Sequence, residues 1–317
     1  MCLFNLLKLC QHYERKNGQM TEILQTKAWA IESNFFDTVA PIVLHRLAIG
    51  KDLSVLQASH NYPEVKAGES VQVSALLSYD RQNGYHAKEQ DGSVIPMTRI
   101  TGTIQKNGMC SPGTREIGEQ LQLQDANPTV KGHLLYIDSP GGAVDGTPEF
   151  GSIIAGLTKP VVAYVDGMAA SAAYWVASQS SYIVANVNNI TQVGSIGTLC
   201  MLTNQGEYLK KEGIKVQIMR AEKSKDKARI NSIEEWPEES LKQMQQDLNE
   251  INELFISAVT RGRGDRLQTS EDIFTAKMYK KEQALQLGMI DKIGTLADAI
   301  AAVRNIALNK KSTYLTY

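Results

Sequence analysis

Two short segments combine serine and glycine in a pattern that suits acyl transfer. They are DSPGG (residues 138–142) and MAASAAY (residues 168–174), and each lies between a short apolar run and a helix-like run. A serine at the start of a helix can act as a nucleophile, and nearby backbone N–H groups can hold the resulting oxyanion. No histidine follows His133 in the chain, so the leading candidate for the general base of Ser171 is a lysine.

The backbone around Ser171 and Gly142 offers the donors that this chemistry requires. A helix N-terminus has unpaired N–H groups and a partial positive charge. A glycine after a strand lets the backbone come close to a ligand. We therefore expect the N–H groups of Gly142 and Ala172 to form an oxyanion hole. The alternative is structural: small residues that allow a helix to pack closely on a sheet, beside an ordinary strand-to-helix turn.

The composition excludes several classes of protein. The 317 residues are 43% hydrophobic and 21% charged, with a net charge of −1, which favours a globular enzyme over a nucleic-acid or anionic-membrane binder. The four cysteines form no Cys-x-x-Cys motif and the five histidines lack metal-ligand spacing, so we expect neither metal nor cofactor. The cysteines suit a reducing compartment, and no signal peptide or transmembrane span is evident. We therefore expect a cytoplasmic protein.

From about Val94 onwards, strand-like and helix-like runs alternate. Continuous apolar strands separated by helices indicate an α/β fold with a parallel sheet covered on both faces. The predicted strands are 95–104, 133–137, 160–165, 182–185, 196–202 and 215–219. The predicted helices are 114–123, 147–157, 169–178 and 205–212, and residues 278–303 are expected to form a helix–turn–strand–helix unit.

A long helix is predicted over residues 237–261, after a charged loop over 221–236. Its apolar residues recur at steps of three and four, which indicates one face that must be covered. They are Leu241, Met244, Leu248, Ile251, Phe255 and Ala258.

Three regions are expected along the chain. Residues 1–92 form an N-terminal extension with a helix around 35–48 and a polar loop over 80–92, and Met20 is an alternative start that would remove residues 1–19. Residues 93–304 form the main domain. Residues 305–317 are expected to be a flexible tail.

The combination of motifs resembles the signal peptide peptidase A (protease IV) family of serine peptidases. The motifs are DSPGG, MAASAAY, the Gly-Ser-Ile-Gly of 194–197, a lysine beyond the next helix–strand pair, and the block over 278–300. The resemblance covers about residues 94–303. It implies the layered fold shared by the Clp protease subunit and the crotonases, a serine peptidase that uses a Ser–Lys dyad, and a homo-oligomeric ring.

The resemblance assigns roles by position. It implies that Ser171 is the nucleophile, Lys225 the general base, Ser195 the residue that orients the lysine, and Gly142 and Ala172 the oxyanion donors. Lys223 is the alternative base, because Lys223, Lys225 and Lys227 alternate along one stretch. A lysine acts as a base near neutral pH only if its pKa falls by about three units, which burial supplies. We expect a partner chain, bound substrate or the helix over 237–261 to provide that burial.

The leading hypothesis is a serine endopeptidase acting on protein or peptide substrates through an acyl-enzyme. Family members either degrade signal-peptide remnants or process bacteriophage capsid and scaffold proteins. The expected lack of a membrane anchor and the N-terminal extension favour a prophage head maturation protease, by analogy. Two alternatives are a crotonase-type acyl-CoA enzyme, which has no use for Ser171, and a catalytically silent assembly protein.

Overall fold

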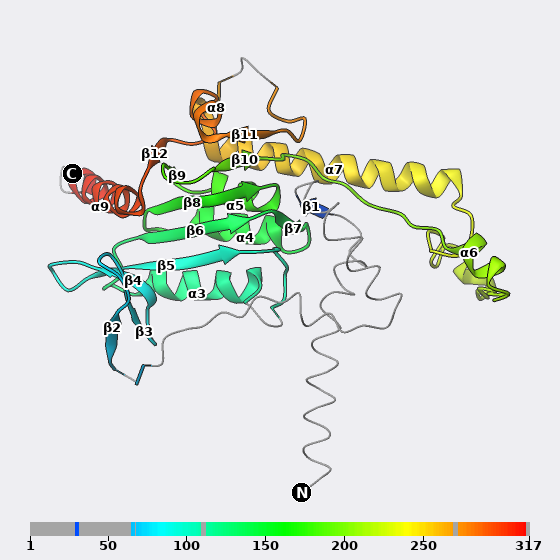
Figure 1. The fold of residues 1–317 in the computed structure, drawn as a ribbon, viewed down its shortest axis with the longest axis horizontal. Coiled ribbons are helices and arrows are strands. Elements are labelled where there is room, and N and C mark those ends of the chain that lie inside the picture. The colour runs from blue at the N-terminus through cyan, green and yellow to red at the C-terminus, as the bar shows by residue number, and fades with distance from the viewer. Residues whose placement is uncertain (1–28, 32–64, 67, 109–111, 269–271, 315–317) are drawn as a thin grey trace, which may run out of the picture.

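The main sheet is mixed, with helices on both faces (Figure 1). The computed structural model describes residues 29–31, 65–66, 68–108, 112–268 and 272–314. The strand order is β11-β10-β8-β6-β5-β4-β3-β2, with β9 paired to β8 and β12 paired to β9. The central pairs β5–β6, β6–β8, β8–β9 and β8–β10 are parallel, as the sequence predicts. The pairs β4–β5 and β10–β11 are antiparallel, so the sheet is parallel at its centre and antiparallel on both sides.

The strands of this sheet are mostly short, and the longest carry the core. Their bounds are β2 Ser70–Gln72, β3 Ser78–Asp80, β4 Gly84–Lys88, β5 Val94–Thr101, β6 His133–Ser139, β8 Val161–Ala170, β9 Tyr182–Asn186, β10 Gln192–Gly194, β11 Met278–Lys280 and β12 Lys292–Gly294. A separate two-stranded ribbon pairs β1 (Trp29–Ile31) with β7 (Gly141–Ala143).

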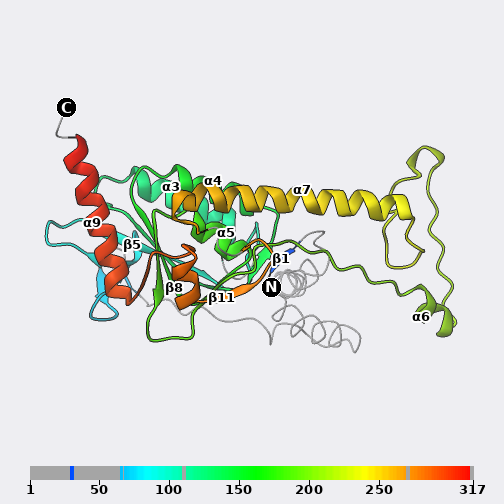
Figure 2. The same ribbon diagram turned by 90° about the horizontal axis from the view of Figure 1, so that it is seen from above.

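Helices cover the two faces of the sheet unequally. Helices α3 (Thr114–Ala126), α4 (Thr147–Gly156), α5 (Ala172–Ser178) and the C-terminal part of α7 (Glu238–Arg263) pack on one face (Figure 2). Helix α9 (Leu296–Tyr314) packs on the other, where Ala299, Ile300 and Val303 meet Leu134 and Val162 of the strands. Helix α8 (Lys281–Gln286) follows β11.

The serine-bearing helix lies at the centre of the first layer. Every residue of α5 is buried, and Trp175 stacks on Phe255 of α7 with ring centroids 4.6 Å apart. Stacked aromatic pairs of this kind add stability beyond their buried area. The small residues predicted around Ser171 therefore do let the helix pack closely on the sheet.

Beyond Ile196 the chain leaves the domain as an arm, which we define as residues 197–254. It runs along α7, where Thr198 Oγ1 donates to Leu248 O at 3.2 Å, and reaches the short helix α6 (Gly206–Lys211). It then turns through the single-turn helix η2 (Glu222–Ser224) and returns as the N-terminal half of α7 (Figure 1). All residues of the arm are described and none is buried.

Several sequence predictions need correction at the edges of the domain. The predicted loop 80–92 contains β4, which pairs with β5, so the main sheet extends into the predicted N-terminal extension. Residues 196–202 and 215–219 form no strand, because the chain leaves the main sheet after β10 and continues as the arm. Helix α9 continues to Tyr314, so the predicted tail from 305 begins as helix. The helix predicted around 35–48 lies outside the described residues.

A buried ion pair ties α7 to the C-terminal block. Arg263 is 1% exposed and donates to both carboxylate oxygens of Asp291, at 2.8 and 2.9 Å. Its Nε and Nη2 also donate to Gly288 O, at 2.9 and 2.8 Å. Ile183 N donates to Asp291 as well, at 2.7 Å, so this pair joins α7, β9 and the segment before β12.

We expect Arg263→Met to lower the free energy of unfolding by about 3–5 kcal/mol, because it leaves the Asp291 carboxylate buried without its cation. Arg304→Met is the matched control. Arg304 pairs with Glu89 at 2.8 Å but is 43% exposed, so we expect a loss of about 1 kcal/mol or less. Urea titration followed by tryptophan fluorescence measures both. Equal losses in the two variants would contradict the role assigned to Arg263.

Candidate active site

Ser171 sits in a strained turn between β8 and α5. Its backbone has φ 54° and ψ −121°, a conformation that costs a residue with a side chain about 1–3 kcal/mol. Hydrogen bonds fix the turn: Ser171 N donates to Gly194 O at 2.8 Å, and Trp175 N donates to Ser171 O at 2.9 Å. The turn places Oγ at the N-terminus of α5, where it donates to Gly197 O at 3.4 Å. Ser171 is completely buried.

The Gly-Ser-Ile-Gly segment forms the second wall of the site. Ser195 also has a positive φ of 52°, and its N–H donates to Lys277 O at 2.8 Å. Because Gly194 O and Gly197 O both accept from Ser171, the structure brings Ser195 beside the predicted nucleophile. Two serines with positive φ angles, Ser171 and Ser195, therefore lie at one site. The sequence does not indicate these backbone conformations.

Gly142 lies in β7, between the main domain and β1. Ile104 N donates to Gly141 O at 2.8 Å, and Ala143 N donates to Ile104 O at 2.9 Å. Neighbouring residues of a strand direct their N–H and C=O groups to opposite sides. The N–H and C=O of Gly142 therefore point towards β1, where Ala30 is its register partner. A Cβ on Gly142 would collide with the backbone of Ile104, so only glycine fits.

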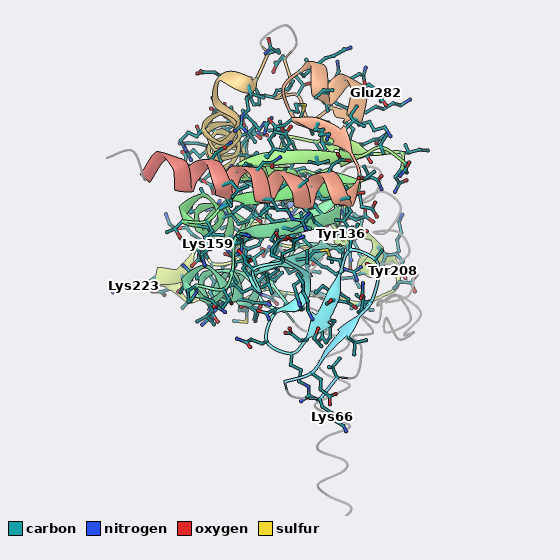
Figure 3. The ribbon with its side chains drawn as sticks, turned by 90° about the vertical axis from the view of Figure 1, so that its left-hand side faces the viewer. Lys66, Tyr136, Lys159, Tyr208, Lys223 and Glu282 are labelled. Carbon is teal, nitrogen blue, oxygen red and sulfur yellow. The ribbon has the colours of Figure 1, made fainter. Side chains whose placement is uncertain are left out.

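The predicted lysines are remote from this site within one chain. Lys225 is exposed and directly follows η2, in the arm that also carries Lys223 and Lys227. Helix α7 contacts α5 at Phe255 and begins at Glu238, so about 25 Å of helix separate its contact with α5 from its start near the lysine loop. Figure 3 shows Lys223 at the periphery of the molecule. Helix α7 of the same chain does not bury Lys225.

A clamp that sequence reasoning missed shapes the loop that carries the lysines. Arg220 donates to Lys227 O at 2.6 Å and to Ala228 O at 2.9 Å, and its guanidinium binds Glu234 at 2.6 and 3.1 Å. Hydrogen bonds from Arg220 and Asn231 lower the pKa of the Glu234 carboxyl. The spacing of Arg220 and Glu234 carries no recognisable sequence signal, because the two meet only when the loop closes.

Two models of known protein families match the part of the chain that contains Ser171. Residues 156–309 match the model of peptidase family S49, and residues 104–186 match that of the Clp protease family. These matches confirm the resemblance to the signal peptide peptidase A family and the α/β fold of the Clp protease class. The chain is a relative of the S49 serine peptidases.

Individual relatives are proteases by name. A putative protease of Methanocaldococcus jannaschii is 34% identical over 58% of each chain. The capsid assembly protease C of Escherichia phage lambda is 28% identical over 74% of this chain and 52% of the relative. Protease 4 of Salmonella typhi is 28% identical over 90% of this chain and 44% of its own length. The chain thus spans about half the length of these curated relatives.

A solved structure of the ClpP1 subunit of Listeria monocytogenes aligns with a TM-score of 0.43 and 13% identity, over 64% of this chain and 93% of that one. In the described part of the chain, no helix combines the length and apolar character that crossing a membrane requires.

We expect Ser171→Gly to be more stable than Ser171→Ala by about 1 kcal/mol, because glycine adopts a positive φ without the steric cost of a Cβ. Ser178 is the control, since it lies within α5 and is also buried. There glycine should be less stable than alanine by about 1 kcal/mol. Thermal unfolding of the four variants tests this reversal of sign, and the same order at both positions would show that the turn at Ser171 is unstrained.

Proposed function

We propose that the chain is a serine endopeptidase that hydrolyses peptide bonds through an acyl-enzyme on Ser171. The observation that supports it best is the buried, strained serine at the β8–α5 turn, with Gly194–Gly197 against it. Backbone strain that the surrounding structure holds in place is characteristic of functional sites. The match to peptidase family S49 points to the same reaction.

In the proposed mechanism, an uncharged lysine amine accepts the Ser171 hydroxyl proton as Oγ attacks the carbonyl carbon of the substrate. The N–H groups of Gly142 and Ala172 donate to the oxyanion, and Ala172 N–H is available because it lies in the first turn of α5. The ammonium then protonates the leaving amine. Water hydrolyses the acyl-enzyme by the same proton transfers in reverse order.

The base is Lys225 in this proposal, with Lys223 as the alternative, and it comes from a neighbouring copy of the chain. The support is the arm, which carries these lysines away from Ser171 of its own domain. The arm also exposes apolar side chains that a neighbouring protomer would cover, among them Met201, Ile214, Val216 and Met219. The arrangement requires a homo-oligomer, for which a ring is the simplest closed form. Ser195 would orient the incoming amine.

The substrate class in this proposal is protein, and phage capsid or scaffold processing is favoured over degradation of signal-peptide remnants. The capsid assembly protease of phage lambda matches 74% of this chain, which supports that choice. A cytoplasmic location belongs to the same proposal, and the cysteine pattern supports it.

Ser171→Ala should abolish labelling by a fluorophosphonate probe and lower peptide hydrolysis at least about a thousandfold, because the nucleophile is lost. Ser178→Ala, the buried control in the same helix, should retain both. Gel fluorescence and a quenched-peptide assay provide the measurements. Labelling that persists in Ser171→Ala, or thioester turnover that is unchanged by it, would favour the crotonase alternative.

Mixing inactive Ser171→Ala and Lys225→Ala proteins under conditions that exchange subunits should restore activity. With equal amounts, about a quarter of the sites should combine an intact serine with an intact lysine from the neighbour. Lys223→Ala and Lys227→Ala identify which lysine acts, since only the variant that lacks the base is inactive alone and regains activity on mixing. If the mixtures remain inactive while mass spectrometry shows exchange, the shared site is wrong.

A further inference from the structure

The N-terminal strand β1 occupies the backbone edge beside the candidate active site. Trp29, Ala30 and Ile31 pair with Ala143, Gly142 and Gly141 in antiparallel register. Ile104 holds the other edge of β7, through Gly141 O and Ala143 N. An extended chain other than Ile104's segment can therefore pair with β7 only along the edge that β1 occupies.

An extended peptide binds a protease or a recognition domain most simply by adding a strand to such an edge. The backbone hydrogen bonds do not depend on sequence, so a segment of the protein's own chain and a foreign peptide compete for the same groups. Here the N–H of Gly142 points towards Ala30 and away from Ile104. That is the N–H which the proposed mechanism requires for the oxyanion.

Two further observations agree with occupation of this edge of β7 by β1. Ser171 is completely buried, so a peptide carbonyl reaches its Oγ only after some covering segment moves. Gly142 has no room for a side chain, since Ile104 backbone atoms would lie as close as 2.0 Å to a Cβ. β7 is therefore held rigidly on one side, and any adjustment that admits a peptide falls on the β1 side.

We propose that β1 is a built-in competitor of peptide substrate, bound along β7 in the place where a substrate strand adds, with the carbonyl of Ala30 on the N–H of Gly142. This rests on the proposed function for the identity of the substrate, but occupancy of the edge is a separate, measurable property. Release of β1 frees Gly142 N–H and opens the edge to a peptide. A tethered segment has a high effective concentration, so it outcompetes weak peptides.

Proline substitutions test the competition, because proline removes a single N–H. Ala30→Pro deletes the N–H that faces Gly142 O, whereas Ile31→Pro deletes one that points away from β7. In a Ser171→Ala background, a fluorescein-labelled peptide spanning residues 26–33 (TKAWAIES) serves as the probe, and anisotropy reports its binding. We expect Ala30→Pro to bind it about tenfold more tightly than the parent, and Ile31→Pro to resemble the parent.

A reversible cross-link tests the occupancy directly. Trp29 and Ala143 form a non-hydrogen-bonded pair, whose Cα atoms lie about 4.5 Å apart in antiparallel sheets, within the range of a disulfide. With the four natural cysteines replaced by serine, Trp29→Cys/Ala143→Cys should oxidise to an intramolecular disulfide. Ile31→Cys/Ala143→Cys, two residues out of register, should not. The disulfide should abolish peptide binding, and a reductant should restore it to the level of the unoxidised protein.

The outcomes separate the two proposals. Equal peptide affinity in the parent, Ala30→Pro and cross-linked proteins would overturn the competition, as would failure of the in-register disulfide to form. Absence of peptide binding in every form would also overturn it, because the edge would then not be a peptide site. If binding behaves as expected while Ser171 of the released Ala30→Pro protein resists fluorophosphonate, the peptidase proposal fails and the occupied edge stands.

Discussion

The hydrogen bond from Ser171 N to Gly194 O is the constraint on which the site depends. It joins the end of β8 to the end of β10, at the point where β8 has already exchanged β9 for β10 as its neighbour. It is the backbone contact that holds a non-glycine residue at φ 54° before a buried helix, and the longer bond from Ser171 Oγ to Gly197 O supports it. The stacking of Trp175 on Phe255 then holds α5 against α7, so the strained turn cannot relax by moving the helix.

The central elements could be predicted because their residues satisfy local rules. The apolar runs at 133–137 and 160–165 are too short for helices and are bounded by turn residues, so they indicate buried strands, and they form β6 and β8. The position of Ser171 at the start of a helix follows from the same logic. Its positive φ could not be predicted, because serine has no preference for that conformation and the cause lies in Gly194, far along the chain.

The arm shows where sequence patterns fail. Residues 215–219 alternate in a way that favours a strand, and the helix over 237–261 has a clear apolar stripe, yet in the single chain neither finds a full partner. Phe255 and Ala258 are buried, whereas Leu241, Met244 and Leu248 are only half-buried. A periodic apolar pattern indicates that one face of a helix or strand will be covered. It does not indicate which chain covers it, and this is why the position of the loop over 221–236 relative to Ser171 could not be predicted.

Strand β7 lies between the N-terminal strand β1 and Ile104, next to the candidate active site. A strand has two edges. Ile104 hydrogen-bonds to one edge of β7, so an extended chain that pairs with β7 near Ser171 must bind the other. In the proposed mechanism β1 binds the oxyanion donor Gly142, the nucleophile Ser171 is buried, and in one chain the base lysine is remote. In that mechanism each of these three features alone keeps the serine inactive, and assembly with a neighbour addresses only the last. The proposed active centre therefore requires two separate events, arrival of a lysine from a neighbour and departure of β1.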